Sequence, residues 1–322
     1  MDSLQTRSTS PPRPMRRLIP DRPARPGVAT ILKALVVQLR PAQWVKNFAC
    51  LAGLIFSGQL FQLGAVLSAL VGFAAYCFAS SSIYILNDYF DREKDRLNPR
   101  TASRPLASGA LPVGVAAVAF VGLLVGAGTL AASLGTACLA ILGTYVLMNG
   151  LYTVSIKKIV IADVMCIALG FVFRVMIGVY AVGARPTPWI VLCMFFLALF
   201  LGFAKRKSEL MVTQGAANKS RAVLAKYGAA YLDTLLTMTS TMAILCYAMF
   251  TVASKKNPSL VVTIVPVVYC VFRYMLQVQM HDRGESPNKL LLQDRRLWVG
   301  ICSWLIIYVT IDYGHIRIFE SM

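Results

Sequence analysis

The sequence has little charge and almost no histidine. Only 14% of its 322 residues are charged, whereas about a quarter are charged in an average soluble protein. His281 and His315 each lack a second histidine at ligand spacing, which argues against a zinc or haem site. The eight cysteines lie in apolar stretches without C-x-x-C spacing, so they indicate neither a disulfide framework nor a metal site.

Long apolar runs take the place of charge. The chain is 57% hydrophobic, and its apolar runs of about 20 residues are each long enough to cross the hydrocarbon core of a bilayer. A transmembrane barrel would instead show short alternating segments. The sequence therefore predicts an all-α, polytopic membrane protein. The nine expected spans cover residues 44–62, 64–86, 112–133, 135–154, 160–183, 188–204, 232–253, 259–279 and 297–315.

The N-terminal segment differs from the rest of the chain. Residues 1–30 are rich in proline and arginine and show no apolar periodicity. They lack the apolar region and the cleavage site of a secretory signal. We expect a disordered basic tail that lies near anionic lipid on the cytoplasmic side, followed by a single transmembrane domain over residues 31–322.

The net charge of +18 follows the expected topology. Lysine and arginine are concentrated before the first span and in the loops near 87–110, 155–158, 205–226 and 281–296, whereas the alternate connections are almost free of them. This is the positive-inside pattern, which predicts a cytoplasmic N-terminus. The basic charge therefore reports membrane orientation, and no nucleic-acid partner is expected.

The scarce acidic residues gather in one stretch, "SSIYILNDYFDREKDRLNPR", residues 81–100. On a continuing helix Asp88, Asp91 and Asp95 would share one face, with Asn87 beside them. Like charges at this spacing repel each other, and Mg²⁺, which prefers hard oxygen ligands, would relieve the repulsion. The alternative is a solvated face in which these acids pair with neighbouring cations, namely Arg92, Lys94, Arg96, Arg100 and Arg104.

Two basic clusters lie on the same expected face of the membrane. "FAKRKSEL" places Lys205, Arg206 and Glu209 within about one helical turn, and "LRPAQWVKN" places Lys46 and Asn47 before the first span. These side chains are candidates for phosphate contacts. Snorkelling of cations at helix ends and interfacial anchoring are the ordinary alternatives.

Two arginines fall inside expected spans, Arg174 and Arg273. A charged side chain in the membrane interior costs several kcal/mol unless it faces a cavity or a partner. Asp163 precedes Arg174 by about three helical turns on the same face. Together, the acidic stretch and the cations predict a cavity that binds a diphosphate through Mg²⁺, beside an apolar cleft for a lipid.

The segment "NDYFDREKDRLNPRTASRPLASG", residues 87–109, resembles the first aspartate-rich motif of the UbiA superfamily of intramembrane prenyltransferases. That motif reads N-D-x-x-D-x-x-x-D and is usually followed by His-Pro, a lysine and Arg-Pro. Asn98 and Thr101 stand at the histidine and lysine positions. The matching residues are Asn87, Asp88, Asp91, Asp95, Pro99, Arg104 and Pro105.

The second acidic motif of the superfamily, D-x-x-x-D, is replaced here by "KRKSEL". With "LRPAQWVKN", "LYTVSIKK", "KYGAAYLDTL" and "SPNKLLLQDRRL", this pattern resembles the branch of decaprenyl-phosphate phosphoribosyltransferases over residues 38–316. The resemblance implies Mg²⁺-dependent transfer of 5-phosphoribose from phosphoribosyl diphosphate to a polyprenyl phosphate, an early step of cell-wall arabinan synthesis. It also implies a bacterial inner-membrane protein with a cytoplasmic active site, which could form homo-oligomers.

The resemblance assigns roles to individual residues. It implies that Asn87, Asp88, Asp91 and Asp95 bind Mg²⁺ and diphosphate, with Asp91 central. The implied substrate contacts are Lys46, Asn47, Arg104, Lys157, Arg174, Lys205, Arg206 and Glu209. A UbiA-type enzyme that transfers a prenyl group to an aromatic acceptor remains an alternative, although the missing second acidic motif argues against it. A transporter is a more distant alternative.

Overall fold

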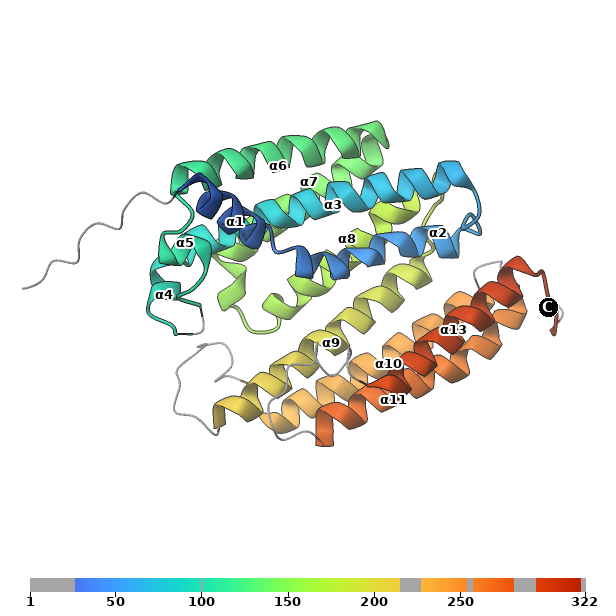
Figure 1. Ribbon diagram of the computed structural model, residues 1–322. Helices are drawn as coiled ribbons and strands as arrows, with labels where there is room; N and C mark the ends of the chain where they lie inside the picture. The colour runs from blue at the N-terminus through green and yellow to red at the C-terminus, as the bar shows by residue number, and fades with distance from the viewer. Residues whose placement is uncertain (1–26, 100, 215–226, 254–256, 281–293, 320–322) are drawn as a thin grey trace, which may run out of the picture.

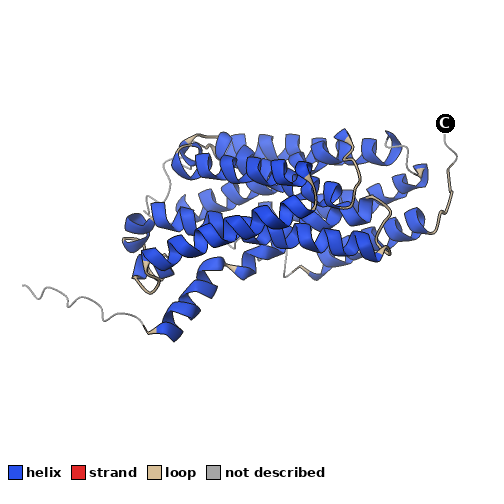
Figure 2. Cartoon of the chain, turned by 90° about the horizontal axis from the view of Figure 1, so that it is seen from above, coloured by secondary structure: helices blue, strands red, loops and turns tan. Residues whose placement is uncertain are grey.

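The computed structural model describes residues 27–99, 101–214, 227–253, 257–280 and 294–319, and helices are the only regular elements in them. The long helices run roughly side by side along one direction (Figures 1 and 2). Eight segments in the described part are long and apolar enough to cross a membrane. The predicted all-α, polytopic membrane fold is therefore confirmed.

The eight segments correspond to the last eight of the nine expected spans. Their helices are α3 (Leu63–Phe90), α6 (Val113–Ser133), α7 (Thr136–Val154), α8 (Ala162–Ala181), α9 (Pro188–Gln214), α10 (Ala229–Ala253), α11 (Ile264–Met280) and α13 (Arg295–Tyr313). The short elements are α1 (Val28–Leu39), α2 (Ala52–Phe56), α4 (Arg92–Arg96), α5 (Pro105–Ser108) and the 3₁₀ helices η1 (Pro41–Leu51), η2 (Ile156–Lys158) and η4 (Pro258–Thr263).

The first expected span, 44–62, does not form one long α-helix. The 3₁₀ helix η1 begins earlier, at Pro41, and the short α2 ends at Phe56. The polar residues Lys46 and Asn47 fall inside η1, which explains why this segment lacks an uninterrupted apolar helix. Gly58, with φ of 75°, closes the segment in a left-handed turn.

Helix α1 begins at Val28, so the last residues assigned to the basic tail are helical. The rest of that prediction, residues 1–26, lies outside the described residues. At the other end of α1, Arg40 is the C-cap residue and adopts the left-handed conformation, with φ of 53°. Pro41 then begins η1.

The helices form two groups that meet along α8 and α9 (Figure 1). In the first group α3 packs against α6, α7, α8 and η1. In the second group α9 packs against α10, and α13 packs against α11. A core that includes Phe200, Leu232, Leu236 and Tyr274 joins the second group to α8. Residues far apart in sequence are thereby brought to one end of the bundle.

Two glycines allow α8 to approach the η1–α2 segment closely. A Cβ atom at Gly178 would overlap the carbonyl oxygen of Cys50, and a Cβ atom at Gly53 would overlap the backbone of Gly178. Small residues at helix crossings permit this kind of backbone contact in membrane proteins. This contact sets the position of η1 along the axis of α8.

We expect Gly178→Ala to destabilise the protein by about 1–3 kcal/mol, because the added methyl group overpacks a backbone contact. The measurement is the melting temperature in detergent. Gly122→Ala is the matched control, since Gly122 is also helical but has no atom within 4 Å of an added Cβ. Equal melting of the two variants would show that α8 and η1 are not in close contact.

Candidate functional site

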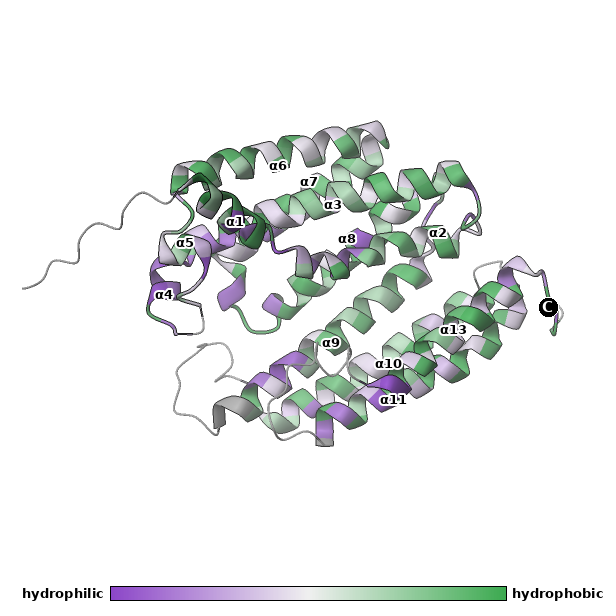
Figure 3. Cartoon of the chain, in the orientation of Figure 1, coloured by the Kyte–Doolittle hydropathy of each residue, from purple (hydrophilic) through white to green (hydrophobic). Residues whose placement is uncertain are grey.

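The polar residues of interest lie at one end of the bundle because several helix ends meet there. Helix α3 has 28 residues, so it is about 42 Å long, whereas the hydrocarbon core is about 30 Å thick. The helix is thus long enough for one end to extend beyond the apolar layer, and its last turn carries the polar residues Asn87 and Asp88. Hydrophilic residues gather around α4 and α5 and toward the C-terminal end of α9 (Figure 3).

Asp88 is the most enclosed of the three aspartates, with its side chain 4% exposed. Nη2 of Arg40 lies 2.7 Å from both carboxylate oxygens. Nε2 of Gln38 donates to Oδ2 at 2.8 Å, and Nη1 of Arg104 donates to Oδ1 at 3.1 Å. Asp88 thus ties the end of α3 to the end of α1 and to the segment before α5.

Arg104 also binds Asp95, whose Oδ2 accepts from Nη1 at 2.7 Å. The guanidinium therefore bridges Asp88 and Asp95. The lysine position of the family motif is held by Thr101, whose hydroxyl donates to the backbone carbonyl of Asp95 at 3.2 Å. Thr101 supports the turn that presents Asp95.

Asp91 has a different environment. The prediction of one continuing helix was wrong, because α3 ends at Phe90 and α4 begins at Arg92, with Asp91 at the break. Its carboxylate accepts from Nζ of Lys157 at 2.8 and 3.0 Å, and its side chain is 33% exposed. The break separates Asp91 from Asp88 and turns it toward η2.

The alternative of a solvated charged face holds for part of the stretch. Glu93 pairs with Arg92 and Arg96 at the surface. Arg104, another neighbouring cation of that alternative, pairs with Asp88 and Asp95. Only the pairs of Asp88 with Arg40 and of Asp91 with Lys157 bring in cations from other segments among the described residues. Arg100 lies outside the described residues.

The second basic cluster is built around a buried ion pair. Nε and Nη2 of Arg206 donate to Oδ2 of Asp163 at 3.1 and 2.8 Å, and both side chains are less than 5% exposed. Nη1 of Arg206 also donates to Glu209 at 2.6 Å. Asp163 lies in the first turn of α8, where the helix dipole favours an acid. This pair joins α8 to α9.

Lys46 lies between the two clusters. The pKa of its ammonium falls from 10.5 to about 8, first because burial disfavours the charged form and then because Lys205, Arg174 and Arg40 are nearby cations. Four cations from different elements thus surround one region. Such a concentration of positive charge favours the binding of an anion.

The two intramembrane arginines have different partners. Arg174 donates to Asn47, and Asp163, which lies about three turns earlier on the same helix, pairs with Arg206. Arg273 donates from Nε to Asp294 at 2.7 Å and caps the start of α13 through that acid. Arg273 therefore joins α11 to α13 and takes no part in the polar site.

The carboxylates provide the hard oxygen atoms that Mg²⁺ prefers. In the described residues, however, no three acidic, histidine or cysteine side chains are grouped as a ready-made metal site. Asp88 and Asp95 both pair with Arg104, whereas Asp91 pairs with Lys157. The donor set therefore fits a metal that completes its coordination with water and phosphate oxygens, as Mg²⁺ usually does.

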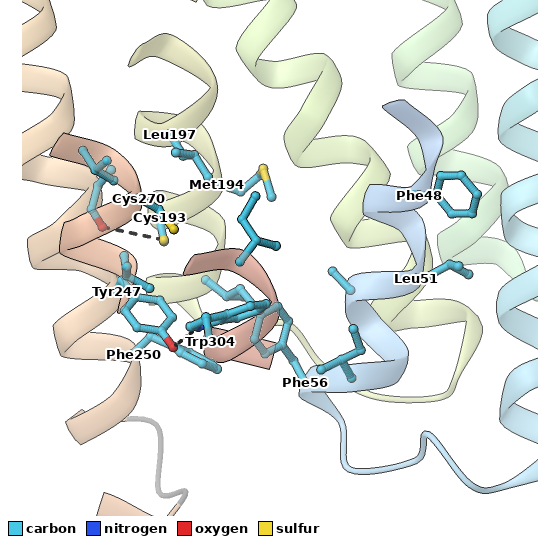
Figure 4. Close-up of a pocket in the computed structure, with 17 residues that line it drawn as sticks. Phe48, Leu51, Phe56, Cys193, Met194, Leu197, Tyr247, Phe250, Cys270 and Trp304 are labelled. Atoms are coloured by element: carbon cyan, nitrogen blue, oxygen red, sulfur yellow. Dashed lines mark hydrogen bonds between the residues drawn. The ribbon is translucent and has the colours of Figure 1, made fainter. Parts of the chain in front are cut away.

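An apolar pocket of about 390 Å³ lies where η1 and α2 face α9, α10, α11 and α13. In Figure 4 Phe56 lies beside Trp304, while Phe48 and Leu51 lie farther along the η1–α2 segment, across from Met194 and Leu197 of α9. Its lining is almost entirely apolar. A pocket of this chemistry suits a hydrocarbon chain.

Gln38 was not among the residues that the sequence assigned to the polar site, and Asp163 was recognised without its partner. Gln38 donates to Asp88, and Asp163 holds Arg206. Gln38 is a polar residue at the end of an otherwise mostly apolar helix, and Asp163 is an isolated acid at the start of an apolar span. Both residues stand out in the sequence as polar residues in apolar stretches, but the sequence does not indicate their partners.

Comparison with known proteins identifies the family of the chain. The model of the UbiA prenyltransferase family matches residues 47–300. The decaprenyl-phosphate phosphoribosyltransferase of Corynebacterium glutamicum is 30% identical over 93% of this chain and 93% of its own. The enzyme of the same name from Mycolicibacterium smegmatis is 29% identical over 85% of this chain and 91% of its own.

Solved structures support the fold. A UbiA homologue from Archaeoglobus fulgidus, bound to GPP and Mg²⁺, superposes with a TM-score of 0.67 at 20% identity over 87% of this chain and 99% of its own. An apo homologue from Aeropyrum pernix gives 0.61 at 17% identity, over 88% and 98%. The family match spans most of the helical bundle and includes the aspartate-rich end of α3. The chain therefore belongs to the UbiA prenyltransferase family of membrane enzymes.

Proposed function

We propose that this enzyme transfers 5-phosphoribose from phosphoribosyl diphosphate to a polyprenyl phosphate and releases diphosphate. The observation that carries the proposal is the buried Arg206–Asp163 pair with Lys205 beside it, at the place of the family's second acidic motif. A prenyl diphosphate carries one diphosphate, whereas phosphoribosyl diphosphate carries a diphosphate and a separate 5-phosphate. The second donor needs more cationic contacts. Within this cluster Lys205 is the exposed cation, and the buried Arg206–Asp163 pair holds the helix end that carries it.

The diphosphate of the donor would bind at the aspartate-rich end of α3. Asp91, Asp95 and Asn87 are the proposed ligands of Mg²⁺, which would neutralise the diphosphate and stabilise its departure. Asp88 would keep Arg40 and Arg104 in place, because its two oxygens already accept from both. Arg104 and Lys157 lie close enough to these acids to contact the bound diphosphate.

The acceptor would use the apolar pocket and the cationic region. The polyprenyl chain would enter the pocket beside Phe48 and Trp304, and its phosphate would meet Lys46 and Lys205. A phosphate oxygen attacks C1 of the ribose as the C1–O bond to diphosphate breaks. A phosphate is already anionic near neutral pH, so the attack needs no general base. Positioning and stabilisation of the leaving group then account for the rate.

The concentration of cations at this end of the bundle supports a cytoplasmic orientation of the site. The resemblance of the motifs to decaprenyl-phosphate phosphoribosyltransferases implies an enzyme of the bacterial inner membrane whose product feeds arabinan synthesis for the cell wall. Phosphoribosyl diphosphate is water-soluble, so a site open to the cytoplasm suits it.

The test uses the purified full-length protein with Mg²⁺, polyprenyl phosphate and phosphoribosyl diphosphate labelled in the ribose. We expect label to move into the organic phase and diphosphate to be released in equal amount. Parallel reactions replace the donor with a prenyl diphosphate and the acceptor with an aromatic acid. Prenyl transfer without phosphoribosyl transfer would overturn the proposal in favour of the ordinary UbiA reaction.

A further inference from the structure

Arg174 is a buried cation without a carboxylate partner. Its side chain is 6% exposed within α8. Nε donates to Oδ1 of Asn47 and Nη1 donates to the carbonyl oxygen of Gly170, each at 2.8 Å. In the part of the chain that the structure describes, no acid approaches the guanidinium within ion-pair distance, and Asp163 is taken by Arg206.

Aromatic rings take the place of the missing acid. The guanidinium carbon lies 4.7 Å from the ring centre of Tyr76, 5.5 Å from that of Tyr145 and 5.1 Å from that of Phe171. Ring faces stabilise a cation by up to about 2 kcal/mol in a desolvated site. They do not cancel its net charge, as a carboxylate would. The positive charge of Arg174 therefore acts on its surroundings.

Asn47 links Arg174 to η1. Its oxygen accepts from Arg174, while its nitrogen donates to Oγ of Ser80 at 3.2 Å and lies 3.3 Å from Sγ of Cys77. Asn47 is fully buried. With both ends of its amide engaged, it joins η1 to α3 and α8. This environment suits a structural link better than the substrate contact expected from the sequence.

Lys46 is the residue immediately before Asn47, and its ammonium lies near Arg40, Arg174 and Lys205. We propose that Arg174 is a positioning residue that, through Asn47 and its own uncancelled charge, holds Lys46 as a contact for a phosphate monoester. The identity of that phosphate rests on the proposed function. It is either the lipid phosphate of the acceptor or the 5-phosphate of the donor, which share the same chemistry.

The sign of the pH effect follows from the charges around Lys46. The charged and titratable groups near it or in contact with its neighbours are Arg40, Tyr84, Asp88, Arg174 and Lys205. Lys46 has a lowered pKa of about 8, so above that pH it loses its proton and its attraction for phosphate. Removing the charge of Arg174, or adding an acid beside it, would raise the pKa of Lys46.

The experiment measures the titration of Lys46 directly. The full-length protein in detergent is labelled with fluorodinitrobenzene across neutral to alkaline pH, and the peptide that contains Lys46 is quantified by mass spectrometry. We expect a midpoint near pH 8 in the wild type. Arg174→Gln and the isosteric Asn47→Asp should each raise it by about one unit. Arg174→Lys keeps the charge and should leave the midpoint near its original value.

Ligand protection identifies the phosphate. Farnesyl phosphate and ribose 5-phosphate are added separately, and the one that slows labelling of Lys46 in the wild type is the source of the phosphate. Protection should be at least about tenfold weaker in Arg174→Lys, because the shorter side chain cannot reproduce the planar contact with Asn47. The absence of protection by both compounds would overturn the assignment of Lys46 as a phosphate contact.

Arg185→Gln is the matched control, because Arg185 is an exposed arginine beyond the far end of α8. Its midpoint should equal that of the wild type. Unchanged midpoints in both Arg174→Gln and Asn47→Asp, with normal melting, would overturn the proposed role of Arg174. Since labelling needs no transfer reaction, a shifted midpoint in a protein without phosphoribosyl transfer would refute the proposed reaction alone.

Discussion

Asp91→Ala is expected to lower the rate of transfer about 10³-fold while leaving the helical bundle folded. Asp91 is the most exposed of the three aspartates, and within the described residues its carboxylate pairs with Lys157 alone. Its loss removes a proposed Mg²⁺ ligand and a group that places Lys157, and single electrostatic contributors to a transition state are worth about 10²–10³ each. The measurements are the turnover rate and the binding of Mn²⁺ in the presence of inorganic diphosphate.

Glu93→Ala is the control for this experiment. Glu93 belongs to the same acidic stretch, but its side chain is 68% exposed, and among the described residues it pairs with Arg92 and Arg96 at the surface. We expect nearly normal turnover, since exposed ion pairs contribute little. If Asp91→Ala behaved like Glu93→Ala, the metal would have to bind elsewhere.

Asp163→Ala is expected to destabilise the protein by about 3–5 kcal/mol, which is the usual effect of removing one partner from a buried ion pair. Arg206 would keep a charge that is 4% exposed, with only Glu209 left to accept from it. The link between α8 and α9 would also be lost. The measurement is the melting temperature or the free energy of unfolding in detergent.

A second variant distinguishes two causes of the expected loss of stability, namely the loss of the Asp163 carboxylate and the unpaired charge left on Arg206. The double variant Asp163→Leu with Arg206→Met removes both charges, and we expect it to recover most of the stability, because apolar replacements of buried pairs are often neutral. It should not recover transfer, since the cationic cluster is incomplete. Equal destabilisation of the single and the double variant would show that the charge on Arg206 is not the cause.

Most of the fold could be predicted because each membrane helix is indicated by an apolar run in its own stretch of sequence. Each apolar run must satisfy its own backbone hydrogen bonds, so a stretch such as Val113–Ser133 has no alternative to a helix. The prediction failed at residues 44–62, where Lys46 and Asn47 interrupt the apolar pattern. The partners of Asn47, Arg174 on α8 and Ser80 on α3, hold this segment in place, and they lie far away in sequence.

The types of residue in the candidate site could be predicted from the sequence, but the ion pairs between them could not. A cluster of acids in a basic membrane protein indicates a candidate site by its composition alone, so Asp88, Asp91 and Asp95 could be named as candidates from the sequence. Which cation meets which acid depends on the break at Asp91 and on the distance that each helix end extends. The division into a fixed carboxylate, Asp88, and an accessible one, Asp91, therefore could not be read from spacing.

The sequence by itself determined the all-helical membrane fold and the acidic stretch, and its motifs indicated the family, because each depends on residues close together in the chain. Only the tertiary structure decided that Asp163 holds Arg206 and that Arg174 holds Asn47. Both arginines are buried, and a buried charge takes whichever partner the packing of the helices brings within reach. That packing depends on contacts such as Gly178 against Cys50, which join segments more than a hundred residues apart.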